Sequence, residues 1–403
     1  MAQTQVLWNK EIEEIKDSGY LNENISITDA LIENFYNEIM CPEEKDLMDV
    51  IFSTNPTQED LEKVLQRWDI EVKQGSKSLL LAYFMKKHPE LDFHKYNAPR
   101  LNGLLLNLRF KNLQITAHYK KIGQELNKHN ITPLIIKGGA MRYLIPDLPR
   151  YMGDIDVLVP AKSWKKAEKV IKNLGYYPKK LDVHSFDVLE NKDSEYGILD
   201  IHKFIFMETN KKTQWLKGLF KRAEEKEIFG VKTLLPSMED LMFITLTNLA
   251  SNLRDHKSQA GILFALFDCK YFLESKPDFD WDIVKKDAKK TGTEVQINFA
   301  IKFINKISEN IIPKEIQHDM LFEKETNDYS RVVMFKRFYY AELQKECRSM
   351  KIADVVKNPA SLGKYLKLKT KYKTLKLLGN HPKLIEIFIK DLNKVYSTVN
   401  KDK

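Results

Sequence analysis

The sequence has few cysteines and no long hydrophobic run. Its three cysteines, Cys41, Cys269 and Cys347, are odd in number and far apart in a chain of 403 residues. This pattern indicates neither a disulfide framework nor a zinc site, and it is typical of the reducing cytoplasm. The sequence contains no run of about 18 apolar residues, so we expect no transmembrane helix. The first residues turn acidic without an apolar stretch, which argues against a signal peptide. We therefore expect a cytoplasmic protein.

Acidic residues are missing from one segment, which carries most of the net charge. The formal net charge is +9, and residues 355–385 contain eight lysines, no arginine and no acid. In a helix, Tyr365, Leu368, Tyr372 and Leu375 would form one apolar stripe. A solvated surface helix explains this pattern, and contact with an anionic acceptor, a nucleic acid or a membrane surface stays open. Nucleic acid is not the favoured partner, because no arginine fork and no RNA-binding motif is present.

Hydrophobic periodicity divides the chain into three regions. Residues 1–125 read as an N-terminal helical region, residues 126–236 mix short strands with helices, and residues 237–403 return to a helical pattern. We therefore predict an α+β fold, in which a small mixed β-sheet core is flanked by N-terminal and C-terminal helical regions.

Several secondary-structure elements can be predicted individually. A helix is expected to begin at Thr57, with Asp60 close to a capping box, and a longer helix to run from Pro99 to about residue 129. Gly175 is expected to end an amphipathic helix, and Ser237 to cap the start of another. Five runs rich in apolar and β-branched residues predict strands: residues 131–139, 154–160, 184–191, 196–206 and 231–236.

Two aspartates alternate in the run "GDIDVLV". On a strand, Asp154 and Asp156 would point to the same face, roughly 6.5–7 Å apart along the backbone. Unpaired carboxylates at this spacing repel each other, and a divalent cation removes that cost. Carboxylate oxygens suit Mg²⁺, which proteins hold with one or two carboxylates together with substrate phosphates. The pair alone also fits an ordinary strand edge, so it does not establish catalysis.

Two further features give the acidic pair more weight. Gly138 and Gly139 lie where a strand meets a helix, so backbone can approach a phosphate at a helix N-terminus. A plain strand-to-helix turn would show the same glycines. Asp200 lies in a second apolar strand, where a carboxylate is costly to bury without a partner. It would complete a metal site and accept a proton as general base, or else pair with a lysine at the surface.

Taken together, these motifs resemble a nucleotidyltransferase family within the polymerase-β-like nucleotidyltransferase superfamily. The similarity lies in "LIIKGGAMRYLI", "LPRYMGDIDVLVP" and "LDIHKFIF", and it covers about residues 110–300. The superfamily pattern is a glycine turn, an alternating acidic pair on a strand, and a single acid on a later strand. One departure is Ala140, which stands where many members have a serine.

The resemblance implies a chemistry and a set of residues. Asp154, Asp156 and Asp200 would bind Mg²⁺, or alternatively Mn²⁺, together with a nucleoside triphosphate, of which ATP is favoured. A nucleoside monophosphate would move to an unidentified acceptor, a metabolite, peptide or protein hydroxyl, and pyrophosphate would leave. The expected nucleotide-binding residues are Lys137, Gly138, Gly139, Arg142, Arg150 and His202.

Two other functions remain compatible with the sequence. One is a non-catalytic nucleotide-binding or scaffold protein on the same fold, and the other is a nucleotidyltransferase that modifies RNA ends. Each of the expected cations also fits a surface role. His202 shares a strand face with Asp200, so it could instead orient a carboxylate or be a structural histidine. Fold alone cannot name the acceptor.

Overall fold

The structure is a computed structural model that describes most of residues 27–319. Within that range the description leaves out residues 40–41, 54, 68–75, 94–97, 146–149, 151, 181–184, 195–196, 206–209, 255–258 and 309–310. The lysine-rich segment 355–385, Cys41 and Cys347 lie outside the described residues. Cys269 is buried and free.

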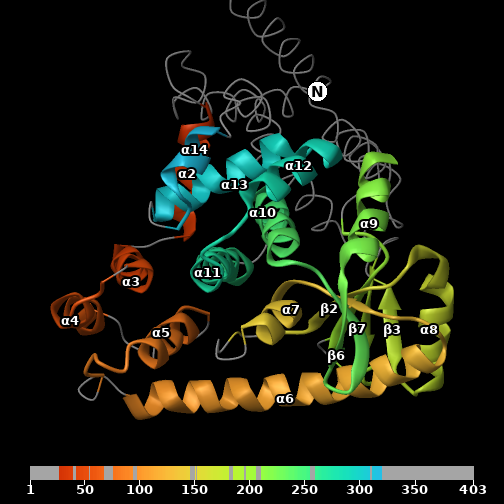
Figure 1. Ribbon diagram of the computed structural model, residues 1–403. Helices are drawn as coiled ribbons and strands as arrows, with labels where there is room; N and C mark the ends of the chain where they lie inside the picture. The colour runs from red at the N-terminus through yellow and green to blue at the C-terminus, as the bar shows by residue number, and fades with distance from the viewer. Residues whose placement is uncertain are drawn as a thin grey trace, which may run out of the picture.

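The N-terminal part of the chain is helical, as predicted (Figure 1). Its helices are α2 (Ile27–Ile39), α3 (Pro42–Phe52), α4 (Gln58–Arg67), α5 (Ser76–Lys87) and α6 (Ala98–Lys128). The predicted capping box begins α4: the Asp60 backbone N–H donates to Thr57 Oγ1 at 3.2 Å, and the Thr57 N–H donates to Asp60 Oδ2 at 3.3 Å. Helix α6 lies under both the helical part and the sheet, because it packs against α5, β7 and α8.

A mixed sheet of seven strands forms the centre of the described chain. The strands are β1 (Leu134–Ile135), β2 (Ile155–Leu158), β3 (Tyr177–Lys180), β4 (Ser185–Leu189), β5 (Leu199–His202), β6 (Glu224–Ile228) and β7 (Val231–Leu235). Their order is β3-β4-β5-β2-β1-β7-β6. Strand β2 runs parallel to β5, and β1 parallel to β7, while the remaining neighbours are antiparallel. The α+β class is confirmed, with a larger sheet than the small one expected.

Helices also lie within the described part of the sheet region. They are α7 (Lys137–Leu144), α8 (Trp164–Asn173), which follows the short helix η2 (Ala161–Ser163), and α9 (Asn210–Arg222). Helix α8 buries Ala167, Val170 and Ile171 on one face. Gly175 follows it at φ 90°, so the predicted glycine stop is confirmed.

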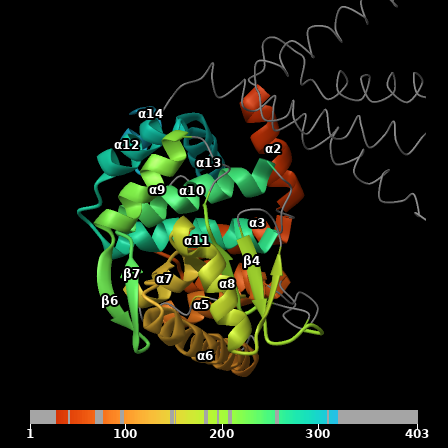
Figure 2. The same cartoon turned by 90° about the vertical axis from the view of Figure 1, so that its right-hand side faces the viewer.

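The chain returns to helices after β7, as predicted. These are α10 (Met238–Arg254), α11 (Gln259–Ser275), α12 (Trp281–Thr291), α13 (Glu294–Ile307) and α14 (Lys314–Asp319). The Asp240 N–H donates to Ser237 Oγ at 3.1 Å, which confirms the predicted cap. Helix α10 packs against α11, α12 and α13, with α12 and α13 above it and α6 at the base of the view (Figure 2).

The two helical parts share one hydrophobic core. Helix α2 packs against α13, and the Phe35 ring meets the Phe299 ring edge-on with centroids 6.1 Å apart. Both rings are fully buried. The ends of the described chain therefore come together beside α10, which packs against α13.

The sequence did not predict β3, β6 or α9. Strand β3 is "YPKK" and β6 is "EEKEI", and both lie at the edges of the sheet. Charged side chains and proline are tolerated at an edge, so these strands lack the apolar runs that the prediction relied on. The predicted boundary between residues 125 and 126 falls inside α6, and the division into domains stays a prediction. Among the described helices, none is long and apolar enough to cross a membrane.

Candidate active site

Three aspartates stand side by side across neighbouring strands. In the parallel pair of β2 and β5, Asp156 lies opposite Asp200. In the antiparallel pair of β5 and β4, Asp200 lies opposite Asp187. Side chains in register on adjacent strands share one face of the sheet, about 4.8 Å apart per strand. The sheet thus gathers carboxylates from positions as far as 44 residues apart in the sequence, Asp156 and Asp200.

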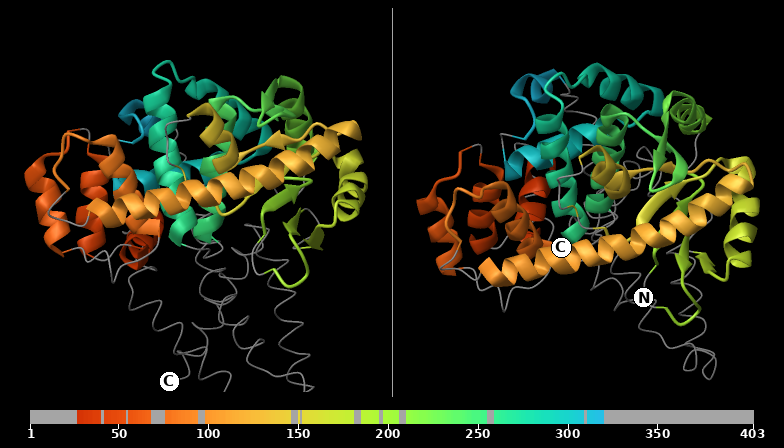
Figure 3. Two further views of the ribbon diagram at one scale, coloured as in Figure 1. Left: turned by 90° about the horizontal axis from the view of Figure 1, so that it is seen from below. Right: turned by 60° about the horizontal axis from the view of Figure 1, so that its bottom comes forward.

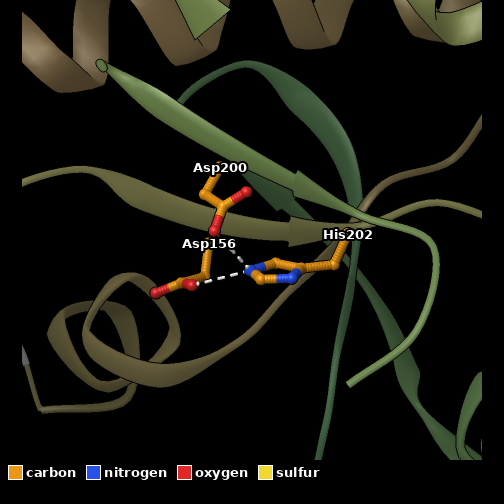
Figure 4. Close-up of side chains that lie close together, drawn as sticks. All are labelled: Asp156, Asp200 and His202. Atoms are coloured by element: carbon orange, nitrogen blue, oxygen red, sulfur yellow. Dashed lines mark hydrogen bonds and ion pairs between the residues drawn. The ribbon is translucent and has the colours of Figure 1, made fainter. Parts of the chain in front are cut away.

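His202 joins two of these carboxylates (Figure 4). Its Nε2 lies 2.9 Å from Asp156 Oδ1 and 3.0 Å from Asp200 Oδ2. Burial lowers the pKa of His202, but the hydrogen bonds to the two carboxylates outweigh burial and raise that pKa to about 9. In the metal-free protein the imidazole is therefore a cation at neutral pH, and it neutralises part of the acidic charge.

Lys137 is the second cation in this cluster. It begins α7 with a positive φ of 52°, and its Nζ lies 2.5 Å from Asp156 Oδ1. Burial raises the pKa of Asp156, but Lys137 and His202 together hold it well below its usual range. Burial also lowers the pKa of Lys137, and Asp156 more than reverses that effect. Asp156 is therefore ionised at any physiological pH.

Asp154 lies just before β2, and its pKa is shifted upward, in the opposite direction from that of Asp156. Burial is the largest cause that raises its pKa to about 7, and the neighbouring charge of Asp156 is the next. Lys137 opposes this rise without cancelling it. A bound cation would favour the ionised form of Asp154, so its present environment matches a site that gains positive charge when it is occupied.

A cavity of about 310 Å³ opens beside the acidic pair. This volume is at the small end of the range for ligand sites. The first turn of α7, the start of β2 and the residues just before it, and helices α10 and α11 surround it. The lining residues are Lys137, Gly138, Arg150, Met152, Gly153, Asp154, Asp156, Thr245, Asn248, Gly261, Phe264, Ala265 and Asp268. The last six come from α10 and α11, and the sequence did not indicate them.

Arg150 is held from two sides in the wall of this cavity. Its Nε donates to Asp268 Oδ1 at 2.7 Å, and its Nη2 donates to Asp268 Oδ2 at 3.0 Å. The guanidinium carbon lies 4.4 Å from the centre of the Phe264 ring. From α6, Asn112 Nδ2 donates to the Arg150 backbone oxygen at 2.8 Å. Asp268 stands in the apolar helix run "AGILFALFDCKYFL", and a lone acid in such a run was the signal that could have found it.

The two glycines of the turn have different surroundings. Gly138 lines the cavity, and a Cβ added there would lie 3.7 Å from the Arg150 guanidinium carbon. At Gly139 an added Cβ would lie 2.9 Å from Ile135 Cγ2 and 3.0 Å from Ile155 Cγ2. Gly139 is therefore needed for close packing of α7 on β1 and β2.

Two other residues complete the comparison with the expected set. Arg142 lies on α7, where burial and the charge of Arg109 lower its pKa, and it is absent from the described residues that line the cavity. Asp187 was not expected. A Cβ at Gly197 would lie 3.1 Å from Asp187 Cγ, so this glycine leaves room for the carboxylate. Burial first, and then the charge of Asp200, raises the pKa of Asp187.

The donor set fits a divalent cation. One ligand atom each of Asp156, Asp200 and His202 lies within 4.8 Å of the others. Asp200 Oδ1 is buried and has no hydrogen-bond partner in the described part of the chain, and neither has His202 Nδ1. An unpartnered buried carboxylate oxygen is costly, and a hard cation would satisfy it. Asp154 and Asp156 offer further oxygens at the cavity.

The comparison with protein families agrees with this geometry. A family described as "Uncharacterised nucleotidyltransferase" matches residues 78–308. The match spans α6, the whole sheet and the helices through α13. No curated protein matches the sequence.

Solved structures give fainter likenesses. An antigenic nucleotidyltransferase-like protein from Paracoccidioides brasiliensis is 15% identical, with 51% of this chain and 96% of that chain covered and a TM-score of 0.32. ANT(2")-Ia in complex with adenylyl-2"-tobramycin is 14% identical over 49% of this chain and 99% of that chain, with a TM-score of 0.25. A tRNA-processing enzyme is 11% identical over 70% and 92%, with a TM-score of 0.23. At these scores nothing is carried over from them to this chain.

Proposed function

Since the chain belongs to the family of uncharacterised nucleotidyltransferases, we propose that it transfers a nucleoside monophosphate from a triphosphate to an acceptor hydroxyl in a Mg²⁺-dependent reaction. ATP is the first triphosphate to test, and Mn²⁺ is the alternative metal. The observation that carries the proposal is the meeting of Asp154, Asp156, Lys137 and Arg150 around one cavity.

The cavity has the features that a triphosphate needs. Gly138 brings backbone to its wall, and Lys137 and Arg150 supply positive charge on the same side. Cations placed before reaction against the phosphates stabilise the charge that develops on the transferring group. The bidentate bond to Asp268 keeps the guanidinium of Arg150 in one orientation. Arg150 is therefore positioned to orient the phosphates. Lys137 can leave its ion pair with Asp156 and contact a phosphate oxygen instead.

The acidic residues would hold the metal and handle the proton. Mg²⁺, when bound by Asp154, Asp156 and Asp200, would neutralise phosphate charge. In the transfer, an acceptor oxygen forms a bond to the α-phosphorus, the bond between that phosphorus and the bridging oxygen breaks, and pyrophosphate leaves. Asp200 lies next to Asp156 on the neighbouring strand, where it can accept the proton of the attacking hydroxyl. His202 orients both carboxylates through its two hydrogen bonds.

The acceptor and the location complete the proposal. The acceptor is a metabolite, a peptide or a protein hydroxyl, and it approaches the α-phosphate from the side of Asp200. We place the protein in the cytoplasm on the basis of its cysteine pattern.

A transfer assay tests the proposal. The full chain is incubated with Mg²⁺ and each of the four triphosphates labelled at the α-phosphate, against a panel of small hydroxyl compounds, peptides and proteins. We expect label transfer and pyrophosphate release that Asp156→Ala abolishes. Asp193→Asn, in an exposed turn outside the site, should keep full activity. Metal-dependent triphosphate binding without turnover across the panel would instead favour the scaffold function.

A further inference from the structure

Large apolar side chains are exposed on one face of α6. Leu106 is 67% exposed, Phe110 61% and Leu113 53%. Among the described residues the only other exposed large hydrophobic side chain is Tyr177, which is less exposed at 38%. Three of the four therefore lie on one helix at spacings of four and three residues. Apolar side chains gathered in this way mark interaction sites rather than ordinary surface.

The same face continues beyond these three residues. Gly103 lies three residues before Leu106, and Ala117 lies four residues after Leu113, so the spacing alternates between three and four throughout. A Cβ added at Gly103 would meet nothing within 4 Å. The opposite face of α6 is buried against the protein, and Figure 3 shows the helix crossing the lower side of the molecule. This spacing is that of a seam between two packed helices.

The ionised side chains of α6 itself have one sign over most of its length. Residues 98–124 contain no acidic residue. Their cations are Arg100, Arg109, Lys111, Lys120 and Lys121. A seam with this border attracts an acidic surface and repels a basic one.

Charge and shape argue against three other occupants. A second copy of α6 or the lysine-rich segment 355–385 would set cations against cations. A bilayer surface would require a broad apolar face, whereas this seam is narrow and is bordered by the amides of Asn102, Asn107 and Gln114. The small side chains at Gly103 and Ala117 allow a second helix to approach closely.

We propose that this face of α6 binds an acidic amphipathic helix of a partner protein. The partner places apolar side chains at alternating spacings of three and four on Leu106, Phe110 and Leu113, and carboxylates beside the cations that flank this face, Arg109, Lys120 and Lys121. The site lies on the same helix as Asn112, which holds the Arg150 backbone at 2.8 Å. The proposal does not depend on the nucleotidyl-transfer reaction.

A peptide titration tests this binding surface. The probe is a fluorescein-labelled synthetic helix of three heptads with leucine in the seam and glutamate at its flanks. A sister peptide carries lysine in place of each glutamate. Fluorescence anisotropy with the full chain should show saturable binding of the acidic peptide that weakens with added salt. Phe110→Asp should weaken it at least tenfold, whereas Tyr177→Asp should leave it unchanged.

Three results would overturn the proposal. They are equal binding of the two peptides, no binding of the acidic peptide to the wild type, and unchanged binding to Phe110→Asp. Two parallel measurements address other occupants. Cosedimentation with vesicles of 70% phosphatidylcholine and 30% phosphatidylserine, lost in Phe110→Asp, would assign the face to a membrane. A photo-crosslinker at position 110 that reacts within the chain or between copies would assign it to the protein itself.

Discussion

Arg150 and Asp268 form a buried, bidentate ion pair that ties the segment before β2 to helix α11. The two hydrogen bonds measure 2.7 and 3.0 Å, and the side chains are only 12% and 6% exposed. The pair joins two parts of the chain that the sequence pattern assigns to different regions. It makes one wall of the cavity in which the acidic pair stands, so the C-terminal helices contribute to the proposed active site.

Removing one partner of this pair should destabilise the protein. Asp268→Ala leaves the guanidinium buried without its counter-charge, which typically costs about 3–5 kcal/mol. Unfolding in urea should therefore show a lower midpoint. The matched control is Glu59→Ala, which breaks an exposed pair with Lys63 on α4 and should leave the midpoint unchanged. Equal midpoints for the two variants would show that the buried pair contributes nothing.

Gly139→Ala should also be destabilising. The added Cβ would lie 2.9 Å from Ile135 Cγ2 and 3.0 Å from Ile155 Cγ2, and overpacking of this kind costs about 1–3 kcal/mol. Gly103→Ala is the control, because its Cβ meets nothing within 4 Å. In a helix interior that change should stabilise by about 0.5–1 kcal/mol. Thermal unfolding of both variants measures the contrast, and the same sign for both would contradict it.

The stability of the metal-free protein should depend on His202. The folded-state pKa of about 9 lies above the ordinary value of 6.5. A histidine with a raised pKa contributes its full stabilisation below 6.5 and loses it as the pH rises through 9. In the presence of EDTA, the difference in unfolding free energy between wild type and His202→Gln should therefore shrink between pH 6.5 and 9. A difference that is constant or grows over this range would contradict the account.

Metal addition should stabilise the protein through Asp200. Asp200 Oδ1 is buried and unpartnered within the described residues, so a cation gains a ligand and relieves that cost. Mn²⁺ should raise the melting temperature of EDTA-treated wild type, and the shift should grow with metal concentration as linkage requires. Asp200→Asn should lose most of the shift, while Asp193→Asn should keep it. An undiminished shift in Asp200→Asn would place the metal elsewhere.

Features whose signals are local could be predicted from the sequence. The glycine turn, the alternating acids and the start of α4 depend on residues within a few positions of one another, and the structure confirms the cap at Thr57 and the glycine stop at Gly175. Apolar runs in the sequence also predicted strands, although β1 is only two residues long.

Other features depend on which strands and helices pair in the fold, so they could not be predicted from neighbouring residues in the sequence. Asp187 meets Asp200 only because β4 and β5 pair in one register. Asp268 reaches Arg150 across 118 positions of sequence. His202 was expected to orient a carboxylate or to contact nucleotide, and the pairing of β2 with β5 lets it contact both Asp156 and Asp200. Strands β3 and β6 were missed because their charged residues suit sheet edges.

The most direct test of the central claim is nucleotidyl transfer by Asp156→Asn compared with Asp193→Asn. Triphosphates labelled at the α-phosphate are supplied with Mg²⁺ and the acceptor panel, and both variants are first shown to unfold as the wild type does. The account predicts label transfer by the wild type and by Asp193→Asn, and a loss of at least about 100-fold in Asp156→Asn. Transfer by Asp156→Asn at the wild-type rate would contradict the assignment of this site.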